Sequence, residues 1–434
     1  MAENVLISDL ADHVGKEITV HGWLHNQRSS GKIAFLIVRD GTGLVQAVMG
    51  RSNVSAAVWS RLDDLDYEAS LQLTGLVRED NRAPGGYELS VTGLEVVGSS
   101  GEDFPIQLKE HGVDFLLENR HLWLRTPRQV AIMRVRDQVV RAIRDFLHDR
   151  GFVNVDTPIL TGAIGESAGT LFSTEYFDLG NAYLAQTGQL YAEAAAAALG
   201  KVYCFGPTFR AEKSKTRRHL VEFWMMEPEM AWCDSECNMR VQEELISYVV
   251  GRAVEELRGE LEGPLERDIP PLANVEPPFP RLSYDEALEK LRSKGSAIEW
   301  GDDLGAEDET RVAEDFDRPV FVYNYPKQAK AFYMKENPED PRTVLCNDLI
   351  APEGYGEIIG GSQREDDYDR LLARIREEGL PEDTYSWYLD LRRYGTFPHS
   401  GFGLGLERTV AWICGVSHIR EVIAFPRTIN RLYP

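Results

Sequence analysis

Residues 16–98 carry five short runs of alternating apolar and polar residues, and this pattern restricts the fold of the chain more than any other feature. A period of two predicts half-buried β-strands, because successive side chains of a strand point to opposite faces of a sheet. Turn signals separate the runs, D-G-T-G at 40–43 and P-G-G at 84–86, and a helical pattern, SAAVWSRLDDL, follows the third run. Five strands with a helix after the third is the element order of an OB-fold, a small barrel that commonly binds oligonucleotides. A purely structural β-barrel would give the same pattern, so the runs alone leave the role of this domain open.

The rest of the chain predicts a larger domain of the α+β class. Residues 101–120 are polar and weakly periodic, so we expect a hinge or linker there, between an N-terminal domain over 1–100 and a C-terminal domain over 121–434. In the second domain, strand-like runs follow one another without regular crossover helices, which favours an antiparallel sheet flanked by helices. Residues 255–320 are rich in acidic residues, proline and glycine, and we expect a surface insertion with small elements of its own.

Composition narrows the class of protein. The 434 residues carry a formal net charge of −23 and 43% of them are hydrophobic, which suits a folded protein rather than a disordered polyanion. The first residues contain neither a basic nor an apolar stretch, and no apolar run is long enough to span a bilayer, so we expect a cytoplasmic protein without a membrane partner. The five cysteines are scattered and form no C-x-x-C pair, which favours buried reduced thiols over disulfides or a structural zinc site.

The segment FRAEKSKTRRHLVEF, residues 209–223, concentrates positive charge in this acidic chain. On a strand, Arg210 and Glu212 would share one face, and the loop that follows would bring Arg218 and His219 over it. Guanidinium groups bind phosphate bidentately, and Phe223 offers a ring on which a purine can stack, so the segment suits a nucleoside triphosphate. For the loop KSKTRRH alone, a solvated charged hairpin is the simpler interpretation.

Two further segments fit a bound triphosphate. Arg408 follows Gly405 at the expected start of a helix, where backbone N–H groups favour an anion. Asp348 and Glu357 lie among apolar and glycine residues, where an unpaired carboxylate is costly and a magnesium ion that bridges a triphosphate would satisfy it. Without a phosphate ligand, these carboxylates would take ordinary turn or capping roles.

Three motifs together resemble the signatures of the class II aminoacyl-tRNA synthetases, within the aspartyl, asparaginyl and lysyl subgroup. They are FVNVDTPIL with Pro158, which predicts a strand; FRAE with the basic loop and RHLVEF; and GLGLER, which ends in Arg408. Their order and wide spacing make the resemblance specific, and it covers nearly the whole chain. It implies a catalytic domain with an antiparallel sheet, ATP bound with Mg²⁺, a homodimer formed through the first motif, and a tRNA partner.

The resemblance also implies roles for single residues. It assigns catalysis to Arg210 and Arg408, and metal binding to Glu357 and Asp348. The residues that it assigns to ATP are Arg210, Glu212, Arg218, His219, Leu220, Phe223, Glu357, Gly405 and Arg408. The N-terminal barrel is the anticodon-binding domain of this subgroup, and the residues that match its base-stacking and base-reading positions are Arg28, Phe35, Gln46 and Glu79.

The segment TGQLYAEAAAAALG, residues 187–200, bears on the amino acid. Aspartyl enzymes have S-P-Q-L-[YF]-K-Q there, and their Lys pairs with the substrate carboxylate, whereas this chain has Ala192. Glu227 stands where those enzymes have Asp; without a cation beside it, it would accept a hydrogen bond from the NH₂ of asparagine and repel aspartate. Arg364 would donate to the side-chain oxygen of either substrate.

Further contacts with the amino acid carry over to Glu166, Gln189 and Arg210. One departure from the asparaginyl pattern is GESAGTLF, where Ser167 replaces a glycine. This loop usually closes over the substrate, and the substitution leaves its closing behaviour undetermined.

Together the residues and the resemblance predict ATP-dependent ligation of L-asparagine to tRNA(Asn) through an asparaginyl-adenylate, with release of pyrophosphate and AMP. An aspartyl enzyme, including one that charges both tRNAs, is the nearest alternative, and Ala192 and Glu227 count against it. A tRNA-independent enzyme similar to asparagine synthetase is a second alternative, against which the OB-like domain counts. A non-catalytic RNA-binding paralogue is a third, against which the complete phosphate-binding set counts.

Overall fold

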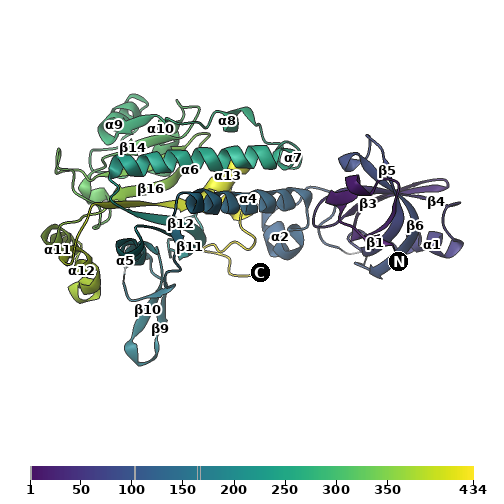
Figure 1. The fold of residues 1–434 in the computed structure, drawn as a ribbon, viewed down its shortest axis with the longest axis horizontal. Helices are drawn as coiled ribbons and strands as arrows, with labels where there is room; N and C mark the ends of the chain where they lie inside the picture. Colours follow the sequence, from purple (N-terminus) through teal and green to yellow (C-terminus); the bar gives the residue numbers. More distant parts are fainter. Residues whose placement is uncertain (1, 102–103, 164, 167) are drawn as a thin grey trace. The chain divides into compact units, whose positions relative to one another are not determined.

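The computed structural model describes every residue except 1, 102–103, 164 and 167 (Figure 1). The chain divides into two compact units, Met1–Val113 and Asp114–Pro434. The division falls in the segment 101–120 predicted as a linker, which contains the short helix α2 (Val113–Glu118) and ends where α3 (Arg120–Trp123) begins.

The N-terminal unit is a six-stranded sheet in which β2 pairs with β5 as well as with β1 and β3, so that the sheet closes on itself. Its five long strands and the helix after the third of them confirm the predicted OB-fold element order. The short β1, which pairs parallel to β2, was not predicted. The elements are β1 (Glu3–Asn4), β2 (Glu17–Ser30), β3 (Ile33–Arg39), β4 (Leu44–Gly50), α1 (Ala56–Ser60), β5 (Ser70–Glu79) and β6 (Tyr87–Gly98).

The C-terminal unit is built on an eight-stranded sheet with the order β13-β14-β15-β16-β17-β12-β11-β7. Only the outermost pairs, β13–β14 and β11–β7, are parallel, which confirms the predicted antiparallel α+β architecture. The strands are β7 (Val153–Asn154), β11 (Lys201–Phe209), β12 (Glu222–Ala231), β13 (Arg281–Ser283), β14 (Val320–Tyr323), β15 (Cys346–Ala351), β16 (Gly356–Gln363) and β17 (His399–Gly405). A small separate sheet contains β8 (Leu160–Thr161), β9 (Ser173–Glu175) and β10 (Asn181–Leu184).

Two long helices, α4 (Pro127–Asp149) and α6 (Ser235–Glu256), run side by side along one face of this sheet (Figure 1). Pro127 suits the first turn of α4, where a missing N–H costs nothing, and the apolar residues that follow recur at helical spacing. Their buried side chains share one core with β12, β16, β17 and α13 (Leu406–Cys414). The other helices are α5 (Gln189–Leu199), α7 (Arg258–Glu262), α8 (Pro270–Ala273), α9 (Tyr284–Ser293), α10 (Ala306–Ala313), α11 (Tyr368–Glu377) and α12 (Ser386–Arg393).

Two predicted elements differ in the structure. The strand expected over FVNVDTPIL is reduced to β7 and β8, with an irregular stretch around Pro158, which has no N–H to offer a ladder. The segment 255–320, expected as a surface insertion, is built into the unit: β13 joins the sheet edge beside β14, and Tyr284, Leu288 and Val312 pack in one buried cluster with β14 and β15. None of the described helices combines the length and the apolarity needed to cross a bilayer.

Candidate active site

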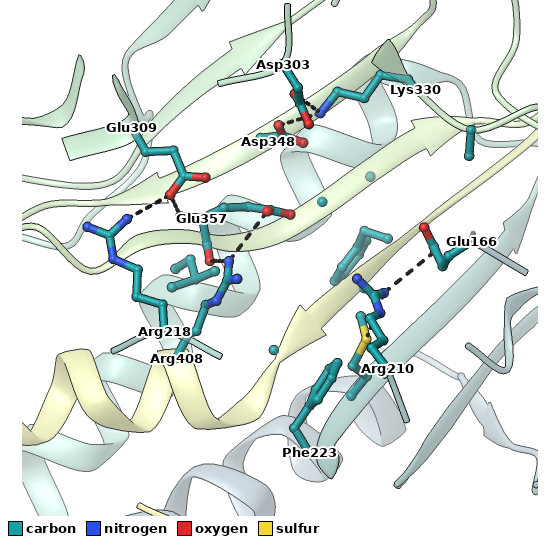
Figure 2. A pocket seen from close by; sticks show the side chains of 18 of the residues that line it. Glu166, Arg210, Arg218, Phe223, Asp303, Glu309, Lys330, Asp348, Glu357 and Arg408 are labelled. Atoms are coloured by element: carbon teal, nitrogen blue, oxygen red, sulfur yellow. Dashed lines mark hydrogen bonds and ion pairs between the residues drawn. The ribbon is translucent and has the colours of Figure 1, made fainter. Parts of the chain in front are cut away.

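A cavity of about 520 Å³ lies over the sheet of the C-terminal unit (Figure 2). Strands β12, β16 and β17 contribute its floor, where Gly360, Gly361 and Gly403 carry no side chain to fill the space. The segment after β11 and residues between 303 and 334 contribute its walls. The volume is typical of a site for a small molecule.

All the residues that the sequence analysis assigned to ATP, the amino acid or the metal line this one cavity, although they are far apart in the chain. They are Glu166, Gln189, Arg210, Glu212, Arg218, His219, Leu220, Phe223, Glu227, Asp348, Glu357, Arg364, Gly405 and Arg408. Ser167 lies outside the described residues.

The strand face predicted for Arg210 and Glu212 is not observed. Strand β11 ends at Phe209, and the chain then leaves the sheet, with Arg210 N donating to Val221 O at 3.0 Å. Both side chains nevertheless reach the cavity.

Arg210 offers its guanidinium to this cavity (Figure 2). The group lies 3.8 Å from Glu166 and 5.6 Å from the centre of the Phe223 ring. Its Nε is buried and has no hydrogen-bond partner in the described part of the protein. Burial lowers the pKa of Arg210, but Glu166 and then Glu212 outweigh burial and raise it. Arg210 is therefore a fixed cation with a donor available for an anionic ligand.

Arg218, in contrast, is held by protein acceptors. It donates to Ala306 O and Glu309 Oε2 at 3.0 Å, to Thr310 Oγ1 at 2.6 Å and to Gly354 O. These four bonds occupy both Nη atoms, so a phosphate could bind the Nη donors of Arg218 only by replacing some of these partners. No local pattern in the sequence indicates this competition, because the acceptors lie about 90 or more residues away, on and beside α10.

His219 and Arg408 lie on the same side of the cavity. His219 Nε2 is 3.4 Å from Glu212 Oε2, and burial, followed by Arg408, lowers the pKa of His219. Helix α13 begins directly after Gly405, as predicted, so Arg408 stands in its first turn, where the helix dipole favours a phosphate. Arg408 Nη1 donates to Glu357 O at 2.8 Å and lies 3.5 Å from the Glu357 carboxylate.

The two predicted metal ligands differ in their surroundings (Figure 2). Asp348 is paired, contrary to the expectation from the sequence. Lys330 Nζ donates to it at 2.8 Å and also lies 3.1 Å from Asp303. Burial, and then the neighbouring Asp348, raise the pKa of Glu357 to about 7, although Arg408 opposes this.

These two carboxylates fit a divalent cation. Both lie over Gly360, where a Cβ atom would be 2.6 Å from Glu357 Oε1 and 3.6 Å from Asp348 Oδ1. The described residues contain no cluster of three or more acidic, histidine or cysteine ligands. Two carboxylates that leave the remaining positions to phosphate and water are the donor set that Mg²⁺ usually takes.

Glu227 lines the cavity from β12 and is already hydrogen-bonded. Gly188 N donates to it at 2.9 Å, the Cys204 thiol at 3.5 Å, and the Thr187 hydroxyl donates as well. The pKa of Glu227 is raised, because burial outweighs the hydrogen bonds from Thr187 and Gly188, which lower it. Ala192, where aspartyl enzymes have Lys, is fully buried in a small hydrophobic cluster.

Arg364 is paired rather than free. Its Nη2 and Nε donate to the two carboxylate oxygens of Glu229, at 2.5 and 3.3 Å, and its Nη1 donates to Ser362 Oγ at 2.7 Å. Burial lowers the pKa of Arg364, but Glu229 outweighs burial and raises it. Glu229, which no sequence motif assigned to the site, thus balances the charge of Arg364.

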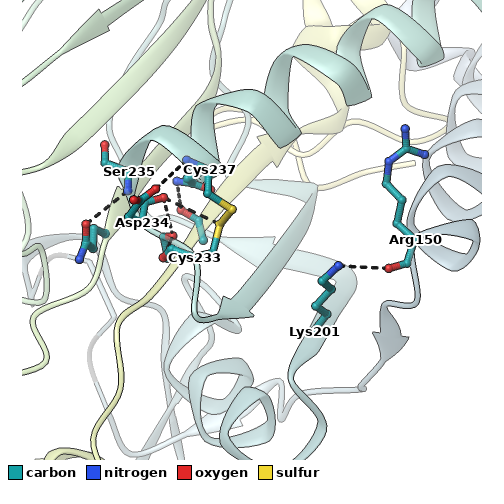
Figure 3. Close-up of a disulfide and its surroundings, with 10 residues drawn as sticks. Arg150, Lys201, Cys233, Asp234, Ser235 and Cys237 are labelled. Atoms are coloured by element: carbon teal, nitrogen blue, oxygen red, sulfur yellow. Dashed lines mark hydrogen bonds between the residues drawn. A yellow bond between two sulfur atoms is a disulfide. The ribbon is translucent and has the colours of Figure 1, made fainter.

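The expectation of reduced cysteines is wrong for one pair: Cys233 and Cys237 form a disulfide (Figure 3). Cys233 follows β12, and Asp234 caps α6 by accepting from Cys237 N at 2.8 Å. This turn brings the two Cα atoms to 5.4 Å, within the range of a disulfide, at a spacing that a search for C-x-x-C does not detect. The remaining cysteines, Cys204, Cys346 and Cys414, are buried and free, as predicted.

The residues predicted to read an anticodon lie on the barrel. Alternation along β3 and β4 turns Phe35 and Gln46 to the outer face, and Gln46 pairs with Ile37, two residues from Phe35. The Arg28 guanidinium lies 4.8 Å from the centre of the Phe35 ring. Glu79, at the exposed end of β5, is separated from β4 by β6.

Comparison with known proteins identifies the family. Residues 112–429 match the family described as tRNA synthetases class II (D, K and N), and residues 18–97 match an OB-fold nucleic acid binding domain. The chain belongs to the class II tRNA synthetases of the D, K and N group. The resemblance drawn from the three motifs is thereby confirmed.

Several relatives match this synthetase over its whole length. The asparagine–tRNA ligase of Pelotomaculum thermopropionicum is 57% identical over 432 residues, and that of Desulforamulus reducens 56%, each with 100% of both chains covered. The crystal structure of asparaginyl-tRNA synthetase from Pyrococcus horikoshii complexed with asparaginyl-adenylate superposes with a TM-score of 0.96 at 51% identity, again over 100% of both chains.

Two residues of this synthetase site were missed from the sequence. Glu229 could have been found, because it follows Glu227 by two positions on β12 and therefore faces the same side. Lys330 could not, because KQAKAFYMK contains three lysines and no periodicity singles out the one that pairs with Asp348.

The raised pKa of Glu357 predicts how binding of Mg²⁺ with ATP depends on pH. A carboxyl group with a pKa of about 7 is largely protonated at pH 6 and ionised at pH 8, and a metal needs the ionised form. We expect the affinity for ATP in the presence of Mg²⁺ to rise about tenfold between pH 6 and pH 8, measured by calorimetric titration.

In Glu357→Gln this rise should shrink to the change that titration of ATP itself causes. The matched control is Glu307→Gln, which removes a 79% exposed carboxylate from α10 outside the cavity and should behave as the unmodified chain does. An equal pH dependence in Glu357→Gln and the unmodified chain would contradict the assignment.

Proposed function

We propose that this synthetase activates L-asparagine with ATP and transfers it to tRNA(Asn). The observation that carries the proposal is the charge at the amino-acid end of the cavity. Arg364 already donates to Glu229 and Ser362, and Glu227 adds a second buried carboxylate beside the substrate position. An aspartate side chain would bring another anion into this place, whereas the asparagine carboxamide brings no charge and can donate to Glu227.

The relatives support the same substrate. Two asparagine–tRNA ligases share more than half of their residues with this chain over their whole length, and the structure with asparaginyl-adenylate superposes closely. The full-length match, OB-fold included, also speaks against the tRNA-independent and the non-catalytic alternatives.

In the proposed reaction, the asparagine carboxylate attacks the α-phosphorus of ATP and pyrophosphate leaves. No side chain acts as a nucleophile; the chain's own residues hold the reactants and balance charge. Arg210 neutralises the carboxylate and the α-phosphate, and Phe223 stacks on the purine. Arg408 binds terminal phosphates at the start of α13, together with His219 and, once released from Glu309, Arg218. The terminal ribose hydroxyl of tRNA then attacks the adenylate carbonyl, and AMP leaves.

Mg²⁺ fits this scheme at Glu357 and Asp348. When bound, it would draw charge from the phosphate oxygens that it contacts. At the amino-acid end, Glu166 and Gln189 receive the α-ammonium, Glu227 the side-chain NH₂, and Arg364 the side-chain oxygen. We place the reaction in the cytoplasm.

We also propose a homodimer. Phe177 and Leu179, between β9 and β10, are each 82% exposed, and Val153 and Leu160 of the first motif are 43% and 47% exposed. Apolar surface of this kind is normally covered by a partner, here a second copy. Light scattering should therefore give the mass of two chains, and Leu179→Asp should shift it toward one.

The barrel is proposed to bind the anticodon through Phe35, Gln46 and Arg28, with Glu79 at its margin. Stacking of a base on an aromatic ring contributes about 1–3 kcal/mol. Phe35→Ala should therefore raise the KM for tRNA(Asn) by roughly tenfold or more and leave activation of asparagine without tRNA unchanged. Ile33→Ala, on the same strand at an exposed position, is the control. An unchanged KM for tRNA(Asn) in Phe35→Ala, with asparagine activation intact, would refute the assignment.

The function itself is tested by ATP–pyrophosphate exchange without tRNA. Exchange should depend on L-asparagine and exceed exchange with L-aspartate by at least about a hundredfold, because aspartate would add an anion beside Glu227. Arg210→Ala should abolish exchange with the fold intact by circular dichroism. Exchange with aspartate at a similar rate would show that the aspartyl alternative is right.

A further inference from the structure

Glu193 is a fully buried carboxylate on α5 that the reaction described above does not use. It accepts four hydrogen bonds: from Gln189 Nε2 at 3.1 Å and Tyr388 OH at 2.6 Å on Oε1, and from Arg392 Nη2 at 2.7 Å and His399 Nε2 at 2.8 Å on Oε2. The Glu193 and Arg392 side chains have no exposed surface. Of these groups, only Gln189 lines the cavity.

We propose that Glu193 is a positioning residue that sets the preference for asparagine over aspartate, by orienting Gln189 and by adding a fixed negative charge behind Arg364. The proposal rests on the proposed activation of asparagine, and it concerns a residue that does not itself touch the substrate.

The first part of the argument concerns the Gln189 amide. A carboxylate that receives Arg392 and His399 can only accept hydrogen bonds, so the NH₂ group of Gln189 must face it. The Gln189 carbonyl oxygen is then the end left for the cavity, where it can accept from the α-ammonium group of an amino acid. With Gln189 N donating to Thr187 Oγ1 at 3.0 Å and Thr187 bound to Glu227, both sides of the amino-acid position are fixed by one connected set of hydrogen bonds.

The second part concerns charge. Burial raises the pKa of Glu193, but Arg392, then His399 and Arg364, outweigh burial and lower it, so Glu193 is an anion. Its charge also acts on Arg364: after Glu229, Glu193 is the next anion that raises the pKa of this guanidinium.

The cluster is therefore balanced before any substrate enters. Glu193 and Glu229 face the two guanidiniums of Arg364 and Arg392 within the protein interior. Burial raises the pKa of Glu229 to about 7, although Arg364 opposes this, so the two pairs balance above pH 7, where Glu229 is ionised. Charges interact much more strongly there than in water, so a substrate carboxylate beside Arg364 would be an uncompensated anion. A carboxamide leaves the balance unchanged.

Stability gives only a weak reason for a charge at this place. The desolvation of a buried ion pair offsets most of its attraction, and such pairs can often be replaced at no cost in stability. A role in the site explains two observations. Glu193 accepts a hydrogen bond from Gln189 of the cavity wall, and its charge acts on Arg364 without a hydrogen bond between them.

The test compares Glu193→Gln with the unmodified chain in ATP–pyrophosphate exchange with asparagine and with aspartate. Glutamine keeps the shape and removes the charge, and loss of a charge-assisted contact corresponds to roughly tenfold or more in an equilibrium constant. We expect the KM for asparagine to rise by about tenfold, the KM for ATP to stay within about twofold, and the ratio of kcat/KM for asparagine over aspartate to fall by at least about tenfold. An unchanged ratio, with both substrates losing activity equally, would overturn the proposal.

The matched control is Glu243→Gln. Glu243 is a buried glutamate on α6 that accepts from Phe279 N at 3.0 Å and lies away from the residues that line the cavity. It should change neither the KM for asparagine nor the ratio. A similar fall in the ratio in this variant would mean that any buried charge loss has the effect, and would also overturn the proposal.

Tyr388→Phe keeps the proposal testable where Glu193→Gln fails to fold. It removes one hydrogen bond from the oxygen that holds Gln189 and leaves the charge in place. We expect the KM values for asparagine and for aspartate to rise equally, by about threefold to tenfold, so that the ratio is unchanged, while the KM for ATP stays the same. A KM for ATP that rises as much as the KM for asparagine would refute the positioning role. Failure of the unmodified chain to exchange with asparagine would instead refute the proposed function.

Discussion

The ion pair between Glu229 and Arg364 depends on the register of the central sheet and in turn determines the amino-acid end of the cavity. Glu229 on β12 pairs with Gly401 on β17, and Gly401 pairs with Ser362 on β16. A Cβ atom at Gly401 would lie 2.2 Å from Glu229 Oε1, so only glycine lets this carboxylate pass over β17 and reach Arg364. A different register or a larger residue at position 401 would separate the pair and leave two buried charges without partners, which costs several kcal/mol.

The phosphate end of the cavity depends on a different balance. Arg210 Nε has no hydrogen-bond partner among the described residues, whereas Glu357 holds Arg408, Glu309 holds Arg218, and Asp303 with Asp348 holds Lys330. A chain with a net charge of −23 repels polyanions at a distance, so local cations must supply the attraction. Carboxylates pair with these cations in the absence of ligand, and a triphosphate with Mg²⁺ would replace them as the partners.

Local patterns in the sequence predicted the parts of this structure that local physics determines. The alternation over residues 16–98 predicted the barrel, and Gly405 with Arg408 predicted the start of α13. Contacts between distant segments could not be predicted, because no spacing rule relates the residues that they join. Examples are the pairs Arg218–Glu309, Lys330–Asp348 and Glu193–Arg392. The disulfide between Cys233 and Cys237 was missed for another reason, since it depends on the turn between β12 and α6 and not on a motif.

In the proposed assignment, the residues that hold ATP and those that hold asparagine use buried charge in opposite ways, and this difference follows from the charges of the two substrates. ATP is a polyanion, so its end needs cations whose protein partners can be replaced; Glu309 comes from α10, Asp303 from a loop and Asp348 from β15. The asparagine side chain is neutral, so the charged residues around it must keep their protein partners when the substrate binds. Those charges, on Glu193, Glu229, Arg364 and Arg392, lie on or next to the helices and central strands and have almost no exposed surface. Rigid elements hold such a balance better than loops do, because a small displacement of one charge would leave another uncompensated.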